Sequence, residues 1–297
     1  MSHTNTRPQL CEPILKWPGG KRWLAPKLHE LLQAELENCY YEPFLGGAAM
    51  FLAVSPINAV LSDTNKQLID FYLACSKNAN EVVSRARQFS NREDVYYRVR
   101  GSKPNSTIGK AARFLYLNKT CWGGVFRLNQ KGEFNVPFGN SGRRICRKKS
   151  VMASVNKLKE ATFWCCDFEV AFSDTGKGDV IFADPPYTSR GQFNGFVRYN
   201  EKLFSWRDQV RLSESAKSAR KRGAFVAVCG SYHRDVLGLY ENWWVIETQR
   251  ASAVSRKLSS RKQVSECVVL SRKPKYKMAG IRRITKSLVG SIPCHED

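Results

Sequence analysis

Short apolar runs alternate along the chain with segments in which apolar residues recur at helical spacing. Unbroken apolar positions are typical of strands that are buried on both faces, as in a parallel sheet covered by helices. Such runs predict strands near residues 14–16, 39–42, 59–63, 180–183, 224–229, 243–247 and 264–270. Helical spacing predicts helices over 24–36 and 206–222. The alternation favours an α/β fold with a mainly parallel sheet and antiparallel strands at one edge.

Residues 68–159 differ in character from the segments on either side. They are helical, aromatic and basic, and they contain no run typical of a buried strand. Because 297 residues exceed the usual size of one domain, we expect a discontinuous α/β domain, residues 8–67 and 160–271, with an inserted, mainly helical domain over 68–159. At its centre, residues 118–139 predict a small hairpin or ordered loop. Residues 272–297 accumulate cations and contain no acid before position 294, which predicts a flexible basic tail.

The charge of the chain indicates the class of its partner. Forty-eight Lys and Arg stand against 26 Asp and Glu, which gives a formal net charge of +22. A field of one sign and this size favours a polyanion such as nucleic acid. No apolar stretch approaches the ~20 residues of a membrane-spanning helix, and residues 1–8 lack the apolar core of a secretion signal. We therefore expect a cytoplasmic protein that associates with nucleic acid and has no membrane contact.

Ten cysteines and four histidines raise the question of disulfides or a metal site. The cysteines are scattered without a Cys-x-x-Cys pair, which favours reduced thiols in the cytosol. The histidines lack ligand spacing to one another or to a cysteine cluster, so we expect no metal.

The strand predicted at 180–183 is followed by Asp184-Pro185-Pro186-Tyr187. In α/β folds the chemistry takes place at the carboxyl ends of strands. A carboxylate and a proline-flanked carbonyl are acceptors without a donor, so they can hold the two N–H groups of an aminopurine and localise the lone pair of its amine. Tyr187 supplies a flat face for the base. The alternative interpretation is a strand end followed by a proline turn, which is common in any α/β protein.

A glycine loop and a downstream acid form a second group of candidate residues. The strand at 39–42 leads through Gly46 and Gly47 into a helix, an arrangement that lets a ligand approach the backbone at a helix N-terminus. Asp63 ends the next strand, where an acid typically binds ribose hydroxyls. The fingerprint Gly-x-Gly-x-x-Gly is absent, which disfavours a nicotinamide dinucleotide, whereas a lone adenosyl group needs less room for phosphate. Chain reversal is the alternative role of the loop, and a helix N-cap that of Asp63.

Together these motifs resemble the Dam-like (D12 class) family of DNA adenine N6-methyltransferases, which use S-adenosylmethionine. The resemblance runs from about residue 14 to 270. Its parts are the amino-terminal cofactor motif at 15–21, the glycine loop at 42–47, the ribose-binding strand end at 62–65, the target-recognition segment at 119–139 and the catalytic motif at 184–187. It implies a Rossmann-like, S-adenosylmethionine-dependent methyltransferase sheet with a target-recognition domain over 68–159, and adenine N6 in double-stranded DNA as the target.

The same resemblance implies roles for individual residues. The implied catalytic residues are Asp184, Pro185, Pro186 and Tyr187. Contacts to the cofactor are implied for Trp17, Lys21, Glu42, Gly46, Asp63, Asp167, Phe168 and Asp184, with the Phe168 ring packed on the cofactor's adenine. Contacts to DNA are implied for Trp122, Val125, Arg127, Asn135, Pro137, Arg143 and Arg144. Trp122 is a candidate for filling the base stack, and a core tryptophan is the alternative.

The chain departs from the family at two places. Ala48 stands where a glycine is usual, so the cofactor loop carries an extra methyl group. Members that methylate GATC usually show Tyr-Asn-Gly-Leu where this chain has Trp-Gly-Gly-Val at 122–125, whereas Arg127, whose fork can bind guanine bidentately, is present. A GATC-like target is therefore a hypothesis. N4-cytosine methylation and a non-catalytic DNA-binding or regulatory module are the alternative functions.

Overall fold

The computed structural model describes residues 11–139, 148–187, 204–251 and 263–292, and the chain forms two compact units. The first unit comprises Met1–His29, Gly46–Ile57 and Asn65–Cys165. The second comprises Glu30–Leu45, Asn58–Thr64 and Cys166–Asp297. Helix α1 (Ala25–Glu35) contributes residues to both.

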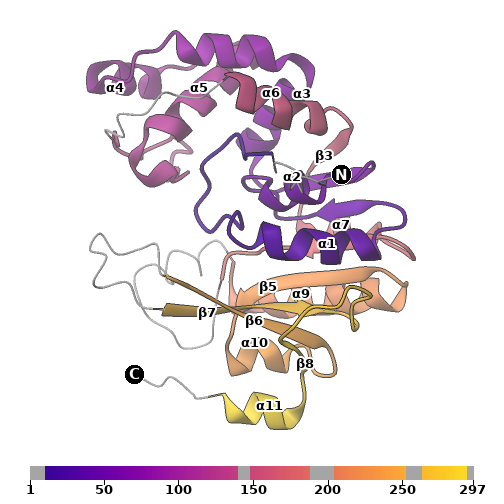
Figure 1. Cartoon of the computed structure of the whole chain (residues 1–297). Coiled ribbons are helices and arrows are strands. Elements are labelled where there is room, and N and C mark those ends of the chain that lie inside the picture. Colours follow the sequence, from indigo (N-terminus) through magenta and orange to yellow (C-terminus); the bar gives the residue numbers. More distant parts are fainter. Residues whose placement is uncertain (1–10, 140–147, 188–203, 252–262, 293–297) are drawn as a thin grey trace, which may run out of the picture. The chain divides into compact units, whose positions relative to one another are not determined.

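The second unit contains a mixed sheet in the order β2-β1-β4-β5-β7-β6-β8. Figure 1 labels its strands β5, β7, β6 and β8. Its parallel strands are β2 (Ala59–Asp63), β1 (Tyr40–Glu42), β4 (Val180–Ala183) and β5 (Phe225–Ser231). Its antiparallel strands are β7 (Gln263–Leu270), β6 (Trp244–Ala251) and β8 (Ile281–Arg283). This confirms the prediction of an α/β fold with antiparallel strands at one edge.

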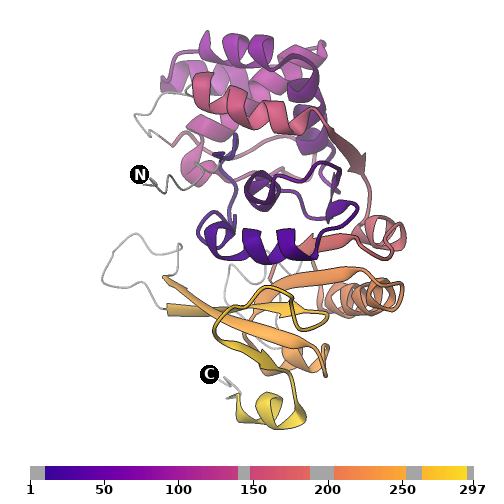
Figure 2. The ribbon, with the colours of Figure 1, turned by 45° about the vertical axis from the view of Figure 1, so that its right-hand side comes forward.

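Burial explains why the strands read as unbroken apolar runs. All four residues of β4 are buried, and so are six of the seven in β5, because helices cover the sheet. Helix α9 (Trp206–Lys221) packs on β5 and on α7 (Phe168–Ser173), and Figure 2 shows it beside the sheet. Its buried Leu212, Ala216 and Ala219 follow helical spacing, and Ser205 and Asp208 form a capping box at its start. Helix α10 (Arg234–Gly238) follows β5.

The first unit is built mainly from helices. Helix α3 (Lys66–Arg87) packs against α5 (Thr107–Thr120) and α6 (Lys148–Leu158), as Figure 1 shows, and α4 (Glu93–Gly101) packs on α5. Buried aromatic rings fill this helical core: Phe71, Tyr72, Tyr96, Phe114 and Tyr116. The remaining regular elements described here are α2 (Ala49–Val54), the 3-10 turn η1 (Trp122–Gly124) and β3 (Ala161–Cys165). The unit also includes residues 11–29 and 46–57, which the sequence-based boundaries assign to the α/β domain.

Two local predictions are wrong. Residues 14–16 do not form a strand, because the backbone of Lys16 is hydrogen-bonded on both its N–H and its C=O by the side chain of Asn118. The basic segment after β7 is folded over 272–292 instead of forming a flexible tail, since it contains β8 and helix α11 (Lys286–Ser291). Acids from other segments balance its cations, as in the ion pair between Arg272 and the buried Glu35 at 2.8 Å.

Two further findings concern the described residues. No helix among them combines the length and the apolar character needed to cross a membrane. Their eight cysteines are free thiols, and no group of three or more acidic, histidine or cysteine side chains in this part of the chain could hold a metal ion.

Candidate functional site

Three acids lie at the carboxyl edge of the parallel strands. Glu42 ends β1, Asp63 ends β2, and Asp184 follows directly after β4. The register places Glu42 opposite Leu61, two residues before Asp63, and Tyr41 opposite Ile181, three residues before Asp184. Because parallel strands end at the same edge, the second unit gathers carboxylates from three neighbouring strands.

This edge includes the point at which the strand order reverses. From β1 the chain continues to β2 on one side, whereas β4 lies on the other side of β1. Open α/β sheets bind ligands in the crevice outside such a switch point. Asp63 and Asp184 are half-buried, and Glu42 is buried, with one carboxylate oxygen accepting a 2.8 Å hydrogen bond from the Tyr40 hydroxyl. Burial and the neighbouring Glu42 carboxylate raise the pKa of Tyr40 well above its usual value, so Tyr40 stays a donor.

The segment after β4 places its tyrosine against a buried acid. Pro185 is buried, and Tyr187 donates a 3.1 Å hydrogen bond from its hydroxyl to Oε2 of Glu266 on β7. Burial, followed by the charge of Asp184, raises the pKa of Tyr187 well above its usual value, so the phenol remains protonated. Sequence reasoning missed Glu266, although an acid inside a mostly apolar strand is a signal for a buried polar role.

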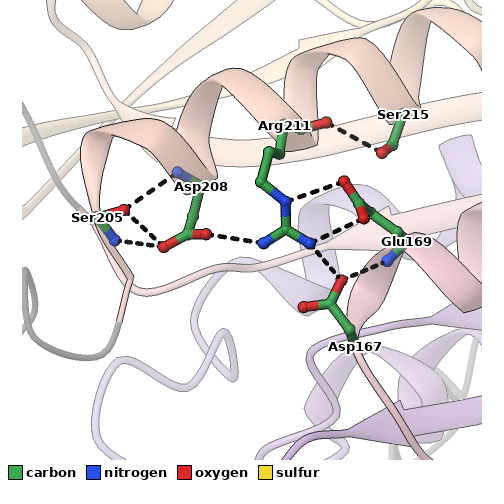
Figure 3. A network of polar contacts seen from close by, with 6 residues as sticks. All are labelled: Asp167, Glu169, Ser205, Asp208, Arg211 and Ser215. Atoms are coloured by element: carbon green, nitrogen blue, oxygen red, sulfur yellow. Dashed lines mark hydrogen bonds and ion pairs between the residues drawn. The ribbon is translucent and has the colours of Figure 1, made fainter.

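Asp167 and Phe168 begin helix α7. The Asp167 side chain caps the helix by accepting a 3.0 Å hydrogen bond from the Glu169 N–H. Phe168 is only 4% exposed, because Phe44 stacks on it with ring centroids 5.5 Å apart and the Arg211 guanidinium lies over its ring at 5.0 Å. Phe44 is half-buried and is therefore the more exposed ring of the pair. Arg211 also pairs with Asp167 at 3.1 Å (Figure 3).

Trp17 and Gly46 lie in contact within the first unit. Gly46 has a φ of 45°, and a Cβ added there would lie 2.7 Å from Cδ1 of the Trp17 ring. The carbonyl of Gly46 accepts a 2.9 Å hydrogen bond from the buried Tyr72 hydroxyl. Lys21 is 4% exposed, and its ammonium donates to the Gly19 carbonyl at 2.9 Å. A glycine is therefore required at position 46 both for the backbone conformation and for the closeness of the indole ring.

The predicted recognition segment is anchored on the amino-terminal motif. The buried Asn118 side chain accepts from the Lys16 N–H at 2.9 Å and donates to its carbonyl at 2.7 Å, and the Lys16 ammonium donates to the Lys119 carbonyl. The Trp17 ring stacks on Phe126 with centroids 6.0 Å apart. Sequence reasoning missed Asn118, whose only signal was an amide inside the apolar face of a helix.

Within the segment, isolated bridges join Cys121 to Phe138 and Leu128 to Phe134, which agrees with the small hairpin or ordered loop that we predict. Trp122 is 51% exposed, which contradicts the core alternative for this residue. Arg127 is exposed and donates from Nε to the Asn135 side chain at 2.8 Å. Pro137 is exposed and Val125 is half-buried. Arg143 and Arg144 lie outside the described residues.

A basic groove of about 840 Å³ opens beside this segment in the first unit. Its walls come from α3, from α4 and α5, and from the segment itself, through Asn129 and Asn135. Two acids, Asp70 and Glu133, and six basic residues line the groove. The basic residues are Lys66, Lys77, Arg100, Lys103, Lys110 and Arg113. Sequence reasoning missed the groove because these cations are scattered over three helices and the loop after α4, and they converge only in the fold.

Comparison with known proteins gives a consistent result. A family model described as D12 class N6 adenine-specific DNA methyltransferase matches residues 17–268. The chain is 31% identical over 268 residues to the type II methyltransferase M1.LlaDCHI of Lactococcus lactis subsp. cremoris, covering 86% of this chain and 94% of the relative. It is 32% identical over 267 residues to the retron Ec67 DNA adenine methylase of Escherichia coli, covering 87% and 90%. It is 33% identical over 216 residues to the DNA adenine methylase of Haemophilus influenzae, covering 70% and 75%.

Proposed function

Because the chain belongs to the D12 class of N6 adenine-specific DNA methyltransferases, we propose that it transfers a methyl group from S-adenosylmethionine to N6 of a flipped-out adenine in double-stranded DNA. The observation that carries this proposal is the position of Asp184. It directly follows a buried strand at the switch point of the sheet, and Tyr187 of the same motif is held by a hydrogen bond to Glu266.

The acceptors in this motif suit the chemistry of an aromatic amine. The amine of adenine is a poor nucleophile because its lone pair is delocalised into the ring. Asp184 and the Pro185 carbonyl accept its two N–H groups, which favours a localised lone pair. As the new N–C bond forms and the S–C bond breaks, one N–H proton leaves the nitrogen. The Asp184 carboxylate, which already accepts a hydrogen bond from this amine, receives the proton and passes it to water. Tyr187, kept neutral by its raised pKa, offers its ring to the base.

The carboxylates at the sheet edge fit a ligand with several donors. Asp63 suits the ribose hydroxyls, since a carboxylate accepts two hydrogen bonds, and Asp167 presents a further acceptor. When bound, S-adenosylmethionine supplies a methyl group on a positively charged sulfur. Trp17, Lys21, Glu42 and Gly46 are further proposed contacts: an indole face suits a sulfonium and an ammonium suits a carboxylate.

The first unit offers a surface for DNA. Cations hold phosphates and carry no sequence information, whereas exposed side chains read base edges. The basic groove suits the first role, and the exposed Trp122 and Arg127 suit the second. Asn135 holds Nε of Arg127, and among the described residues the two terminal nitrogens of the guanidinium have no hydrogen-bond partner, so they suit a guanine. A GATC-like site is the hypothesis that follows from this arginine.

The test is identification of the methylated nucleoside. The protein is incubated with unmethylated duplex DNA and S-adenosylmethionine carrying a deuterated methyl group, and the DNA is digested and analysed by mass spectrometry. We expect the label in N6-methyl-2′-deoxyadenosine, and sequencing of the modified sites gives the target. Label in N4-methyl-2′-deoxycytidine would show that cytosine, and not adenine, is the substrate. Binding of DNA without any label and without calorimetric binding of S-adenosylmethionine would make the chain a non-catalytic module.

A further inference from the structure

Arg211 binds three carboxylates from two helices at once (Figure 3). On helix α9 its guanidinium donates to Oδ1 of Asp208 at 2.8 Å. Toward helix α7 it donates to Oδ1 of Asp167 at 3.1 Å and to both oxygens of Glu169, at 3.0 and 2.8 Å. The same group lies over the Phe168 ring at 5.0 Å. All of these residues belong to the second unit.

This network is more than an ordinary surface ion pair. A single exposed pair contributes little to stability, but networks with planar, forked geometry contribute more. Here all three nitrogens of one guanidinium are engaged, and the Arg211 side chain is only 32% exposed. Asp208 is itself fixed by the capping box with Ser205. The Asp167–Phe168 turn is therefore held by a rigid point on α9.

Asp167 is the member of the network that can meet a ligand. Its side chain is 42% exposed, and only Oδ1 of its two oxygens has partners among the described residues, namely Arg211 and the Glu169 N–H. Oδ2 remains as an acceptor. Phe168, by contrast, is buried at 4% exposure beneath Phe44 and Arg211, so it supports the turn from inside.

We propose that Arg211 is a positioning residue for the cofactor's adenine: it holds the Asp167 carboxylate so that Oδ2 accepts a hydrogen bond from the exocyclic amine of that ring. This inference rests on the proposed function and extends it to a residue that sequence reasoning did not select. A carboxylate fixed through one oxygen loses little freedom on binding, which favours affinity. The hydrogen bond requires the exocyclic amine, so Arg211 should affect the affinity for the ligand only when that amine is present.

The experiment compares two ligands and four proteins by calorimetry. The ligands are S-adenosylhomocysteine and its 6-deamino analogue, in which hydrogen replaces the amine. The proteins are the unmodified chain, Arg211→Gln, Arg211→Lys and the control Arg220→Gln. Arg220 also lies on α9 and stacks on an aromatic ring, Trp243 at 5.5 Å, so its replacement removes the same charge from the same helix.

We expect the unmodified chain to bind the adenosyl ligand roughly 10-fold more tightly than the deamino ligand, the worth of one hydrogen bond to a charged acceptor. In Arg211→Gln this preference should fall to about 2-fold or less, through weaker binding of the adenosyl ligand. Arg211→Lys should retain part of the preference for the adenosyl ligand, because lysine keeps the positive charge but lacks the planar, forked guanidinium. Arg220→Gln should keep the full preference.

Two results would overturn the inference: an undiminished preference in both Arg211 variants, or an equal loss for both ligands, which would make Arg211 a purely structural residue. Thermal unfolding checks that each variant is folded. Should Arg211→Gln fail to fold, Arg211→Lys provides the same comparison. Failure of the unmodified chain to bind either ligand would instead contradict the proposed function, so the two failures are distinguishable.

Discussion

Replacing Gly46 by alanine tests whether the glycine loop is shaped by the indole ring of Trp17. The change adds one methyl group at a residue with a φ of 45°. That methyl group would lie 2.7 Å from Cδ1 and 2.9 Å from Nε1 of Trp17, closer than real Cβ contacts. The ring cannot move away freely, because it stacks on Phe126. Two separate penalties therefore apply, one from the backbone and one from the clash.

The two penalties can be assigned magnitudes. A left-handed conformation costs a residue with a Cβ about 1 to 2 kcal/mol, part of which is offset because alanine restricts the unfolded chain. Forcing an extra methyl group into a packed site costs about 1 to 3 kcal/mol. Gly46→Ala should therefore lower the free energy of unfolding by about 2 to 4 kcal/mol.

Gly19→Ala is the matched control. Gly19 also has a positive φ, 78°, but a Cβ there would meet no atom within 4 Å. It should cost only the backbone term, about 1 kcal/mol. Both variants are made in the natural chain and in a Trp17→Ala background, and their stabilities are measured by urea unfolding. With the indole removed, Gly46→Ala should cost no more than Gly19→Ala.

An equal loss of stability for the two alanine variants in the natural chain would refute this reasoning, because the indole would then impose no constraint on position 46. So would a Gly46→Ala penalty that persists unchanged in the Trp17→Ala background. Calorimetry of S-adenosylmethionine binding on the same variants reports separately on the proposed role of Trp17. A displaced indole should weaken that binding in Gly46→Ala.

Three further predictions concern the DNA surface and a buried thiol. Lys110→Gln should reduce the steepness of log affinity against log salt concentration for duplex DNA by about 0.9, which corresponds to the loss of one phosphate contact. The control Lys217→Gln, at an exposed position on α9, should leave that slope unchanged. Equal slopes for the two variants would contradict the role of the groove in binding phosphates. Trp122→Ala should leave the free energy of unfolding nearly unchanged, since the ring is 51% exposed. It should make flipping of the target base less favourable by about 1 to 3 kcal/mol, measured from the fluorescence of 2-aminopurine at the target position. Unchanged fluorescence would show that Trp122 does not fill the base stack. Burial raises the pKa of the Cys121 thiol from 9.0 to about 11, so the contribution of the neutral thiol to stability is complete below pH 9 and is lost as pH rises toward 11. Relative to Cys121→Ala, the free energy of unfolding of the natural chain should fall by about 2 to 3 kcal/mol over that interval. Parallel pH profiles of stability for the two proteins would contradict this prediction.

The sheet and its acids could be predicted because their signals are local. A strand buried on both faces is an unbroken apolar run, as at 59–63 and 180–183, and a polar residue directly after such a run must lie at the strand end. Asp63 and Asp184 follow from that pattern, and parallel pairing brings the two strand ends to one edge.

The partners of these residues could not be predicted, because they come from distant parts of the chain. Asn118 holds a backbone 102 positions away, Glu266 binds a tyrosine 79 positions away, and Arg211 reaches an acid 44 positions away. Each depends on packing that no local pattern encodes. The expectation of a flexible basic tail failed for the same reason, since Arg272 and Arg282 are paired with acids on α1 and β6.

The rate of methyl transfer by Asp184→Asn tests most directly whether this carboxylate makes the adenine amine reactive. The asparagine has the same size but lacks the negative charge, and Glu214→Gln, an exposed acid on α9, is the control for charge. Under single-turnover conditions with saturating S-adenosylmethionine, we expect formation of N6-methyladenine to fall by about 10²-fold or more in Asp184→Asn, with DNA binding and thermal unfolding retained, and to be unchanged in Glu214→Gln. A folded Asp184→Asn protein that methylates adenine at the natural rate would contradict the proposed role of Asp184.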